Sequence, residues 1–414
     1  MARDPRHAAR LLIVTDTTEF YPPFTGGGTE RQLSELSYEL ARDGIDVSAV
    51  ARIGDPSLVP TDAAAASFPI AHLGPGGGAK GAGWATLIPN VLFVMRVFWF
   101  LARYRARYDV LLVSGFRQLA LPSAIVARLT DKRCIVRIES AWDLQARVSA
   151  ESEARMGRHG HRFVSLAIRA VRRAVFRLAN HTVAFSEEIR TQLIEMGAHA
   201  SRIRRIPNGV DTQRFAPTHA ATKRTLRVQL GLPQDKTLFI FTGRICRSKG
   251  VLDLLRLWQT LAHRSDLHLV LVGSGAGSHD NCEPQARELM AAHPQALTMT
   301  GGVNNVEQYL QACDAFIFLS HFEAFSLSIL EALATGLPAI VTDVSGAREV
   351  IQPHAWGTIV PVGADTAHLT REVDWLLSRQ HEWPTLGRLA REAVVDRYSM
   401  AAVARRYAAL IQGA

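Results

Sequence analysis

The chain has 414 residues, of which 48% are hydrophobic and 21% charged, which is typical of globular domains and excludes a disordered or fibrous chain. Its length suits two or three domains of roughly 100–200 residues each. The net charge of +9 indicates either an anionic partner or an arginine-rich solvated surface. Nucleic acid is disfavoured as that partner, because no helix-turn-helix pattern and no basic motif with interleaved aromatic residues accompanies the charge.

The cysteines and the N-terminus bear on the compartment. Four cysteines lie far apart and form no C-x-x-C pair: Cys134, Cys246, Cys282 and Cys313. This spacing argues against a zinc site or a disulfide framework and favours a reducing cytoplasm. The N-terminal sequence MARDPRHAARLLIVTD has no apolar core of signal-peptide length before its first strand, so export is not expected.

Strand and helix patterns alternate along the first half, which predicts an α/β domain with a parallel sheet. The first predicted strand is followed by a loop with Gly26, Gly27 and Gly28, and then by a helix that Gly44 ends. Glycines of this kind let backbone N–H groups approach a phosphate, although flexible hairpins look the same. The predicted strands are residues 11–16, 45–50, 109–114, 134–139 and 181–186.

The second half repeats the scheme after a polar segment, residues 212–236, that is predicted to be a linker with a short helix. This repetition predicts a second parallel sheet. Its predicted strands are residues 238–243, 267–273, 297–301, 315–320 and 338–343.

Residues 84–101 are very apolar but are interrupted by Pro89, Asn90 and Arg96. A membrane span needs roughly 20 mostly uncharged residues, so a transmembrane helix is not expected. We predict a buried helix, with shallow contact to a bilayer as the alternative.

Residues 154–186 contain no acidic residue. Within them Arg169, Arg173 and Arg177 recur every four residues and therefore share one face of a helix. Such a face suits an anionic membrane surface, and an ordinary solvated face is the alternative.

The most informative stretch is EAFSLSILE, which places Glu323 and Glu331 eight residues apart. An apolar strand precedes it and a helix follows, so Glu323 is predicted in a loop at the carboxyl end of a strand and Glu331 on the helix. That edge of an α/β sheet binds ligands, and a helix start offers N–H groups to an anion. On spacing alone, two ordinary surface glutamates are the favoured interpretation.

A basic segment, GRICRSKG, follows the strand at residues 238–243. It places Arg244 and Lys249 just after the carboxyl end of that strand, which is also the edge of the sheet where Glu323 is predicted. Arginine can grip phosphate oxygens in a bidentate fork, and lysine supplies a point charge. A basic turn without a ligand is the alternative.

Together these motifs resemble the retaining glycosyltransferases of family 4, which have the GT-B fold. The E-x7-E spacing, the glycine-rich loop, IPNGVD at residues 206–211 and the G-R-x4-K-G pattern occur in the family's order along nearly the whole chain. The resemblance implies two Rossmann-like domains with a cleft between them. It implies an acceptor domain at 1–211, a linker at 212–236, a donor-nucleotide domain at 237–395 and a last helix, 396–414, that crosses back to the first domain.

The resemblance also implies a function, which is transfer of a hexose-type sugar from a nucleotide-sugar donor to a lipid-linked glycan or a small-molecule acceptor. Arg244 and Lys249 would hold the diphosphate, and Glu323 a hydroxyl of the donor sugar. The remaining donor-binding positions that it implies are Gly27, Gly28, Gly273, Ser326, Leu327 and Glu331.

The family pattern is broken at CIVRIESAWD, where many relatives have a histidine at the end of the strand. Glu139, Ser140 and Asp143 are the acceptor-side candidates there. The chain has no D-x-D sequence, so we expect no metal and no cofactor besides the nucleotide sugar.

Three alternatives stay open. Two keep the fold: an epimerase or phosphorylase-like enzyme acting on sugars, and a catalytically silent module that binds glycans. The third is an oxidoreductase, suggested by the strand-ending VGSGAG at residues 272–277. It is disfavoured because no glycine follows at the third fingerprint position and no acidic residue ends the next strand.

Overall fold

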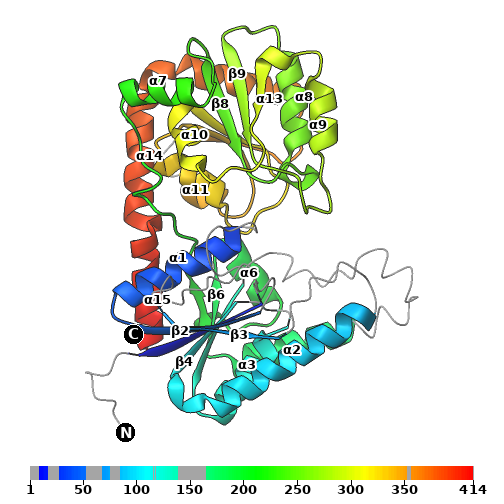
Figure 1. Cartoon of the computed structure of the whole chain (residues 1–414), viewed down its shortest axis with the longest axis vertical. Coiled ribbons are helices and arrows are strands. Elements are labelled where there is room, and N and C mark those ends of the chain that lie inside the picture. The colour runs from blue at the N-terminus through cyan, green and yellow to red at the C-terminus, as the bar shows by residue number, and fades with distance from the viewer. Residues whose placement is uncertain are drawn as a thin grey trace. The chain divides into compact units, whose positions relative to one another are not determined.

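The computed structural model of the chain describes residues 9–16, 28–52, 68–74, 84–114, 116, 118–138, 165–351 and 356–413. The chain divides into two compact units (Figure 1). Unit 1 consists of Met1–Pro207 and Val403–Ala414, and unit 2 of Asn208–Ala402. Each unit is built on one parallel β-sheet with helices packed on it, as the alternating patterns predicted.

The sheet of unit 1 has seven strands in the order β3-β2-β1-β4-β5-β6-β7, and every neighbouring pair is parallel. The direction of the order reverses between β1 and β4, which makes that point the natural ligand-binding edge of a doubly wound sheet. The strands are β1 Arg10–Thr15, β2 Asp46–Arg52, β3 Ile70–Leu73, β4 Val110–Ser114, β5 Arg133–Arg137, β6 His181–Ala184 and β7 Ile203–Arg205.

The helices of unit 1 cover this sheet with apolar faces. In α1, Leu33, Leu36 and Leu40 are all buried, so they share the face of the helix that packs against the domain core. Gly44 has a φ of +83°, so it ends the helix in the left-handed conformation that glycine adopts most readily. The helices are α1 Gly28–Arg42, α2 Trp84–Arg103, α3 Ala120–Leu129, a helix at 165–178 and α6 Glu187–Glu195, with 3-10 turns at Arg105–Arg107 and Ala200–Arg202.

The prediction of a buried helix at residues 84–101 is right for the helix and wrong for one of its faces. Phe93, Val97 and Leu101 are buried. The opposite side of α2 is apolar as well, but it is open to solvent. Its exposed residues are Val91 at 56%, Leu92 at 43%, Met95 at 52% and Trp99 at 66% exposure.

The arginine-rich helix at 165–178 has the predicted asymmetry. Arg169, Arg173 and Arg177 are exposed, while Val175 and Phe176 are buried. Among the helices that the structure describes, none is long and apolar enough to cross a membrane.

The sheet of unit 2 has six parallel strands in the order β10-β9-β8-β11-β12-β13. Its order reverses between β8 and β11. The strands are β8 Thr237–Thr242, β9 Leu267–Val272, β10 Leu297–Met299, β11 Ala315–Phe318, β12 Ala339–Thr342 and β13 Gly357–Val360. The central strands are continuous apolar runs because both of their faces are covered by helices.

The helices of unit 2 include the segment before the sheet, since α7 packs against α10. Arg227 of α7 is buried and donates to the Ala312 carbonyl at 2.8 Å and to Asp314 at 2.6 Å. The helices are α7 Ala220–Gln229, α8 Val251–Leu261, α9 Glu283–Met290, α10 Val306–Ala312, α11 Leu327–Ala334, α12 Ala347–Val350, α13 Thr366–Ser378 and α14 Trp383–Tyr398, with 3-10 turns at Arg247–Lys249, Pro294–Ala296 and Gln380–Glu382.

The last helix, α15 Met400–Gln412, contains the point at which the chain returns from unit 2 to unit 1. Its start is tied to the IPNGVD segment, because Val210 N–H donates to the Tyr398 carbonyl and Met400 N–H to the Val210 carbonyl, both at 2.9 Å. A Cβ on Gly209 would lie 3.0 Å from the Met400 Cα, so a side chain here would have to push the start of α15 aside by a few tenths of an ångström. Within unit 1, Arg133 donates to the carbonyl of Ile411.

Candidate active site

The candidate site lies at the carboxyl edge of the unit 2 sheet, where the strand order reverses. The loop after β8 carries the G-R-x4-K-G segment, and the loop after its neighbour β11 carries Glu323. Because parallel strands end at the same edge, these two loops meet although about 74 residues separate Lys249 from Glu323.

Backbone contacts join the two loops. The Ser248 carbonyl accepts from the His321 N–H at 2.9 Å and from the Ser320 hydroxyl at 3.3 Å. Gly250 has a φ of +68°, and a Cβ there would lie 1.9 Å from the Leu319 carbonyl oxygen. The final glycine of the motif is therefore required by the close approach of the two loops.

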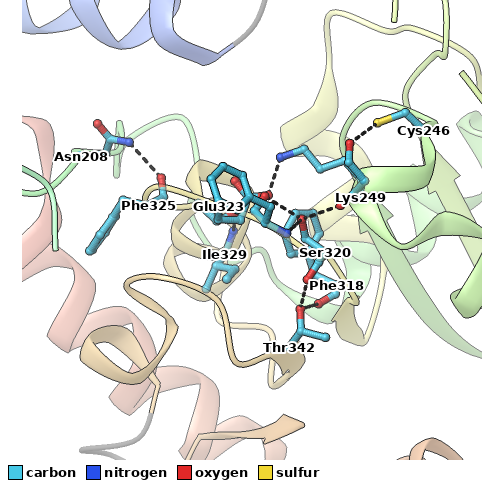
Figure 2. Close-up of polar contacts among 12 residues, drawn as sticks. Asn208, Cys246, Lys249, Phe318, Ser320, Glu323, Phe325, Ile329 and Thr342 are labelled. Carbon is cyan, nitrogen blue, oxygen red and sulfur yellow. Dashed lines mark hydrogen bonds and ion pairs between the residues drawn. The ribbon is translucent and has the colours of Figure 1, made fainter. Parts of the chain in front are cut away.

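The Lys249 ammonium forms an ion pair with the Glu323 carboxylate (Figure 2). The lysine side chain is 19% exposed and the glutamate side chain 11%. Lys249 Nζ also lies 5.8 Å from the centre of the Phe318 ring, at the end of β11. Thus the sequence-predicted residues Lys249 and Glu323 lie in direct contact in a largely desolvated place.

The helix that follows Glu323 presents its N-terminus at the same edge. Ser326 caps α11 by accepting from the Ile329 N–H at 3.5 Å. The N–H groups of Leu327 and Ser328 have no acceptor among the residues that the structure describes. Since the N-terminus of a helix carries a partial positive charge, this end of α11 suits an anion.

Two predicted residues differ in exposure. Glu331 lies on α11 as predicted but is only 4% exposed, and the residue already has an interaction partner in the structure. Arg244 is exposed, and no side-chain hydrogen bond or ion pair of Arg244 occurs within the described part of the chain. Its guanidinium is therefore available to a ligand at the carboxyl edge of the unit 2 sheet.

A third loop, which follows β9, completes the edge. A Cβ on Gly273 would lie 1.8 Å from the Gly243 carbonyl oxygen, so glycine here allows the ends of β8 and β9 to approach. Asp280 accepts from the Ser248 N–H at 2.8 Å and from the Ser278 hydroxyl at 2.7 Å. Burial alone would raise the pKa of Asp280, but these hydrogen bonds outweigh it and hold the pKa far below the usual aspartate range.

Sequence reasoning missed Asp280 and Asn208. Asn208, in the IPNGVD segment, donates to the Phe325 carbonyl at 2.9 Å and so holds the Glu323 loop from its far side (Figure 2). The IPNGVD pattern alone does not indicate a contact with Phe325. Asp280 has no motif of its own, and only its contacts reveal its role.

The loop after β9 also decides against a dinucleotide fingerprint. In such a fingerprint the glycines open directly into a helix whose N-terminus holds the pyrophosphate. Here β9 ends at Val272 and α9 begins only at Glu283. The oxidoreductase alternative is therefore wrong for this segment.

Of the candidates in unit 1, the described part of the chain includes Gly28 alone. Gly28 begins α1 and is exposed. Gly27, Glu139, Ser140 and Asp143 lie outside the described residues. In the part of the chain that the structure describes, no three His, Cys, Asp or Glu side chains gather as a metal site would require.

Comparison with solved structures shows which fold class these two doubly wound units belong to. Sucrose-phosphate synthase from Thermosynechococcus elongatus superposes with a TM-score of 0.77 at 22% identity, over 97% of this chain and 98% of that one. HepE from Anabaena, solved with UDP-glucose, gives a TM-score of 0.74 at 17% identity, over 98% and 100%. The chain has the GT-B fold.

Two family models match successive parts of the chain. The model described as "Glycosyltransferase Family 4" matches residues 26–214, and "Glycosyl transferases group 1" matches residues 222–393. The chain therefore belongs to the family 4 glycosyltransferases.

Among curated relatives, the chain is 35% identical over 228 residues to a GDP-mannose-dependent alpha-mannosyltransferase of Mycobacterium tuberculosis, which covers 54% of each chain. It is 27% identical over 390 residues to a D-inositol 3-phosphate glycosyltransferase of Acidothermus cellulolyticus, over 90% of this chain and 83% of that one. The chain thus matches about half the length of the mannosyltransferase.

The close approach at Gly250 gives a stability prediction with a matched control. Gly250→Ala adds both left-handed strain, about 1–2 kcal/mol, and a clash with Leu319, roughly 1–3 kcal/mol more. Gly277→Ala adds only the strain, since Gly277 has a φ of +76° but nothing within 4 Å of its Cβ. Urea unfolding should show a larger loss for Gly250→Ala. Equal losses in the two variants would contradict the clash.

Asp280 gives a pH prediction. Asp280→Asn should lower the free energy of unfolding by about 1–3 kcal/mol at neutral pH, because it weakens charge-assisted hydrogen bonds. The folded pKa is depressed, so the aspartate's contribution is fully present above about pH 4 and is lost as the pH falls further toward the folded pKa. Urea unfolding of both proteins between pH 7 and pH 3 should show the difference shrinking on acidification. A difference that does not change with pH would remove Asp280 from this role.

Proposed function

We propose that this chain is a retaining glycosyltransferase that moves a hexose from a nucleotide sugar to an acceptor hydroxyl. The observation that carries the proposal is the Lys249–Glu323 pair beside the open N-terminus of α11, at the strand-order reversal of unit 2. This edge offers cations and N–H donors for a diphosphate together with a carboxylate for a hydroxyl. A nucleotide sugar has both groups.

In the proposed reaction, the bond between the sugar C1 and the diphosphate oxygen breaks, and its electrons pass to the diphosphate. Arg244 and Lys249 stabilise this growing charge, so they contribute most in the transition state. The acceptor oxygen bonds to C1 on the face that the diphosphate leaves, and its proton passes to a diphosphate oxygen. No protein nucleophile and no metal are needed in this scheme.

The other predicted residues position the donor. Glu323 accepts from a sugar hydroxyl, the N–H groups at the start of α11 donate to phosphate, and Glu331 accepts from the ribose. We further propose that unit 2 binds the nucleotide and that unit 1 binds the acceptor. Relatives are named for GDP-mannose or were solved with UDP-glucose or ADP, so these nucleotides are the first donors to test.

Replacing Arg244 or Lys249 with Ala should lower turnover about 10²–10³-fold, because each removes a cation from the departing diphosphate. Arg247→Ala is the matched control, since Arg247 is an exposed arginine of the same loop. The measurement is release of nucleoside diphosphate from GDP-mannose, UDP-glucose and ADP-glucose, with and without acceptor and with a chelator present. Wild-type turnover in both variants would exclude them from the site, and release that needs no acceptor would favour a different GT-B reaction.

We also propose that unit 1 binds the surface of an anionic bilayer, which would bring a lipid-linked acceptor to the enzyme on the cytoplasmic side. The connections from β3 to β4, β4 to β5 and β5 to β6 run in one direction across the sheet. Right-handed crossovers therefore put α2, α3 and the helix at 165–178 on the same face. The exposed apolar side of α2 and the exposed arginines of the 165–178 helix thus belong to one helical layer.

Co-sedimentation with liposomes tests this surface. Wild type should bind anionic vesicles at low salt and be released by high salt, because each arginine adds about 1 kcal/mol of screened attraction. Two variants should bind less: Arg169, Arg173 and Arg177 all changed to Gln, and Met95 and Trp99 both changed to Ser. Val228→Ser, which alters an exposed valine of unit 2, should bind like wild type. Equal sedimentation of all four proteins would favour a soluble acceptor.

A further inference from the structure

A row of polar side chains lies at the carboxyl edge of the unit 1 sheet. Thr15 ends β1, Ser114 ends β4 and Arg137 ends β5, and the register pairs Thr15 with Ser114 and Ser114 with Arg137. Register partners in a parallel sheet point to the same face, so the three side chains form one row. They are 1%, 1% and 3% exposed. The row begins at the reversal of strand order, where such sheets bind ligands.

Arg137 is the member of this row whose side chain has no hydrogen-bond partner among the described residues. Its buried Nε has no hydrogen-bond partner, and no ion pair or side-chain hydrogen bond of Arg137 occurs among the described residues. Its one recorded contact is with the Phe185 ring, whose centre lies 5.0 Å from the guanidinium carbon. A cation–π contact does not replace the hydration that a buried charge loses.

The other buried arginines of this protein have hydrogen-bond partners for their guanidinium groups. Three described arginines are more than nine-tenths buried, and they are Arg137, Arg172 and Arg227. Arg227 donates to backbone carbonyls and to Asp314, and Arg172 has partners of its own. Of these three described arginines, Arg137 is the one for which the described residues provide no hydrogen-bond acceptor.

Nearby acidic groups on the next element are engaged elsewhere. Phe185 is followed by Ser186, which caps α6, and then by Glu187 and Glu188. The Glu187 carboxylate pairs with Arg190 and Arg205, and Glu188 accepts from Gln192. Both glutamates are exposed, whereas Arg137 is buried. The start of α6 adds the positive end of a helix to this edge.

We propose that Arg137 binds a phosphate group carried by the acceptor. The planar guanidinium fork matches two phosphate oxygens, and the low exposure of the site strengthens that pairing. The inference rests on the proposed function, since it assigns the acceptor's chemistry. Through this contact of Arg137 the enzyme would select phosphorylated acceptors, whether soluble sugar phosphates or lipid-linked ones.

Equilibrium dialysis of the full-length protein against inorganic phosphate tests the site. Phosphate could also occupy the donor loop, so the binding is measured in wild type and in an Arg244→Ala, Lys249→Ala double variant. An Arg137-dependent site should persist in that double variant and weaken at least tenfold in Arg137→Gln. Arg128→Gln, which removes an exposed arginine from α3 of the same unit, should bind like wild type. Arg137→Lys keeps the charge without the fork and should weaken binding as well, which covers a failure of Arg137→Gln to fold.

Undiminished phosphate binding in Arg137→Gln or Arg137→Lys would overturn the proposal, as would loss of all binding in the donor-loop double variant. Glucose 1-phosphate and vesicles carrying a polyprenyl phosphate then compete against inorganic phosphate. Competition by either compound that depends on Arg137 supports the site, and the compound that competes shows whether the acceptor is soluble or lipid-linked. Competition by neither compound counts against the site.

Binding of nucleoside diphosphate is measured in parallel. If the phosphate test fails but nucleoside diphosphate binds normally, only the inference about Arg137 is wrong. If nucleoside diphosphate does not bind either, the proposed function is wrong as well.

Discussion

The ion pair between Lys249 and Glu323 is the interaction on which the candidate site depends. Each side chain is mostly desolvated, so either one alone would be a costly buried charge. The pair forms only if the loops after β8 and β11 meet, and the surrounding chain is built to make them meet. Gly250 admits the Leu319 carbonyl, Ser248 accepts from the Glu323 loop, and Asp280 holds Ser248 from the other side.

In the structure, Glu323 neutralises the charge of Lys249. Under the proposed function, a nucleotide sugar would replace both halves of this pair: its diphosphate would take over the lysine, and a sugar hydroxyl would take over the carboxylate. The free energy of donor binding is therefore the free energy gained from the new contacts minus the free energy lost when the Lys249–Glu323 ion pair is broken. Binding is favourable only if the gain is larger than the loss.

Sequence reasoning worked where burial is continuous and failed where structure depends on distant partners. The central strands are uninterrupted apolar runs and were all predicted, but β3, β7 and β13 were missed because each is a short sheet edge with half-exposed residues. For α2, composition could not tell a buried apolar face from an exposed one. The motifs placed Lys249 and Glu323 at the correct edge. The sequence does not indicate the roles of Asp280, Asn208 and Arg137. These roles depend on contacts with residues far away in the chain, or, for Arg137, on the lack of a hydrogen-bond partner among the described residues.

The most direct test of this account is calorimetric titration of nucleoside diphosphate and of the matching nucleotide sugar into wild type and Glu323→Gln. Because Glu323 competes with phosphate for Lys249 and also binds the sugar, the account predicts opposite effects. Glu323→Gln should bind the nucleoside diphosphate at least as tightly as wild type but lose the additional affinity that the sugar provides. A variant that loses affinity for the diphosphate and keeps the full contribution of the sugar would contradict the account.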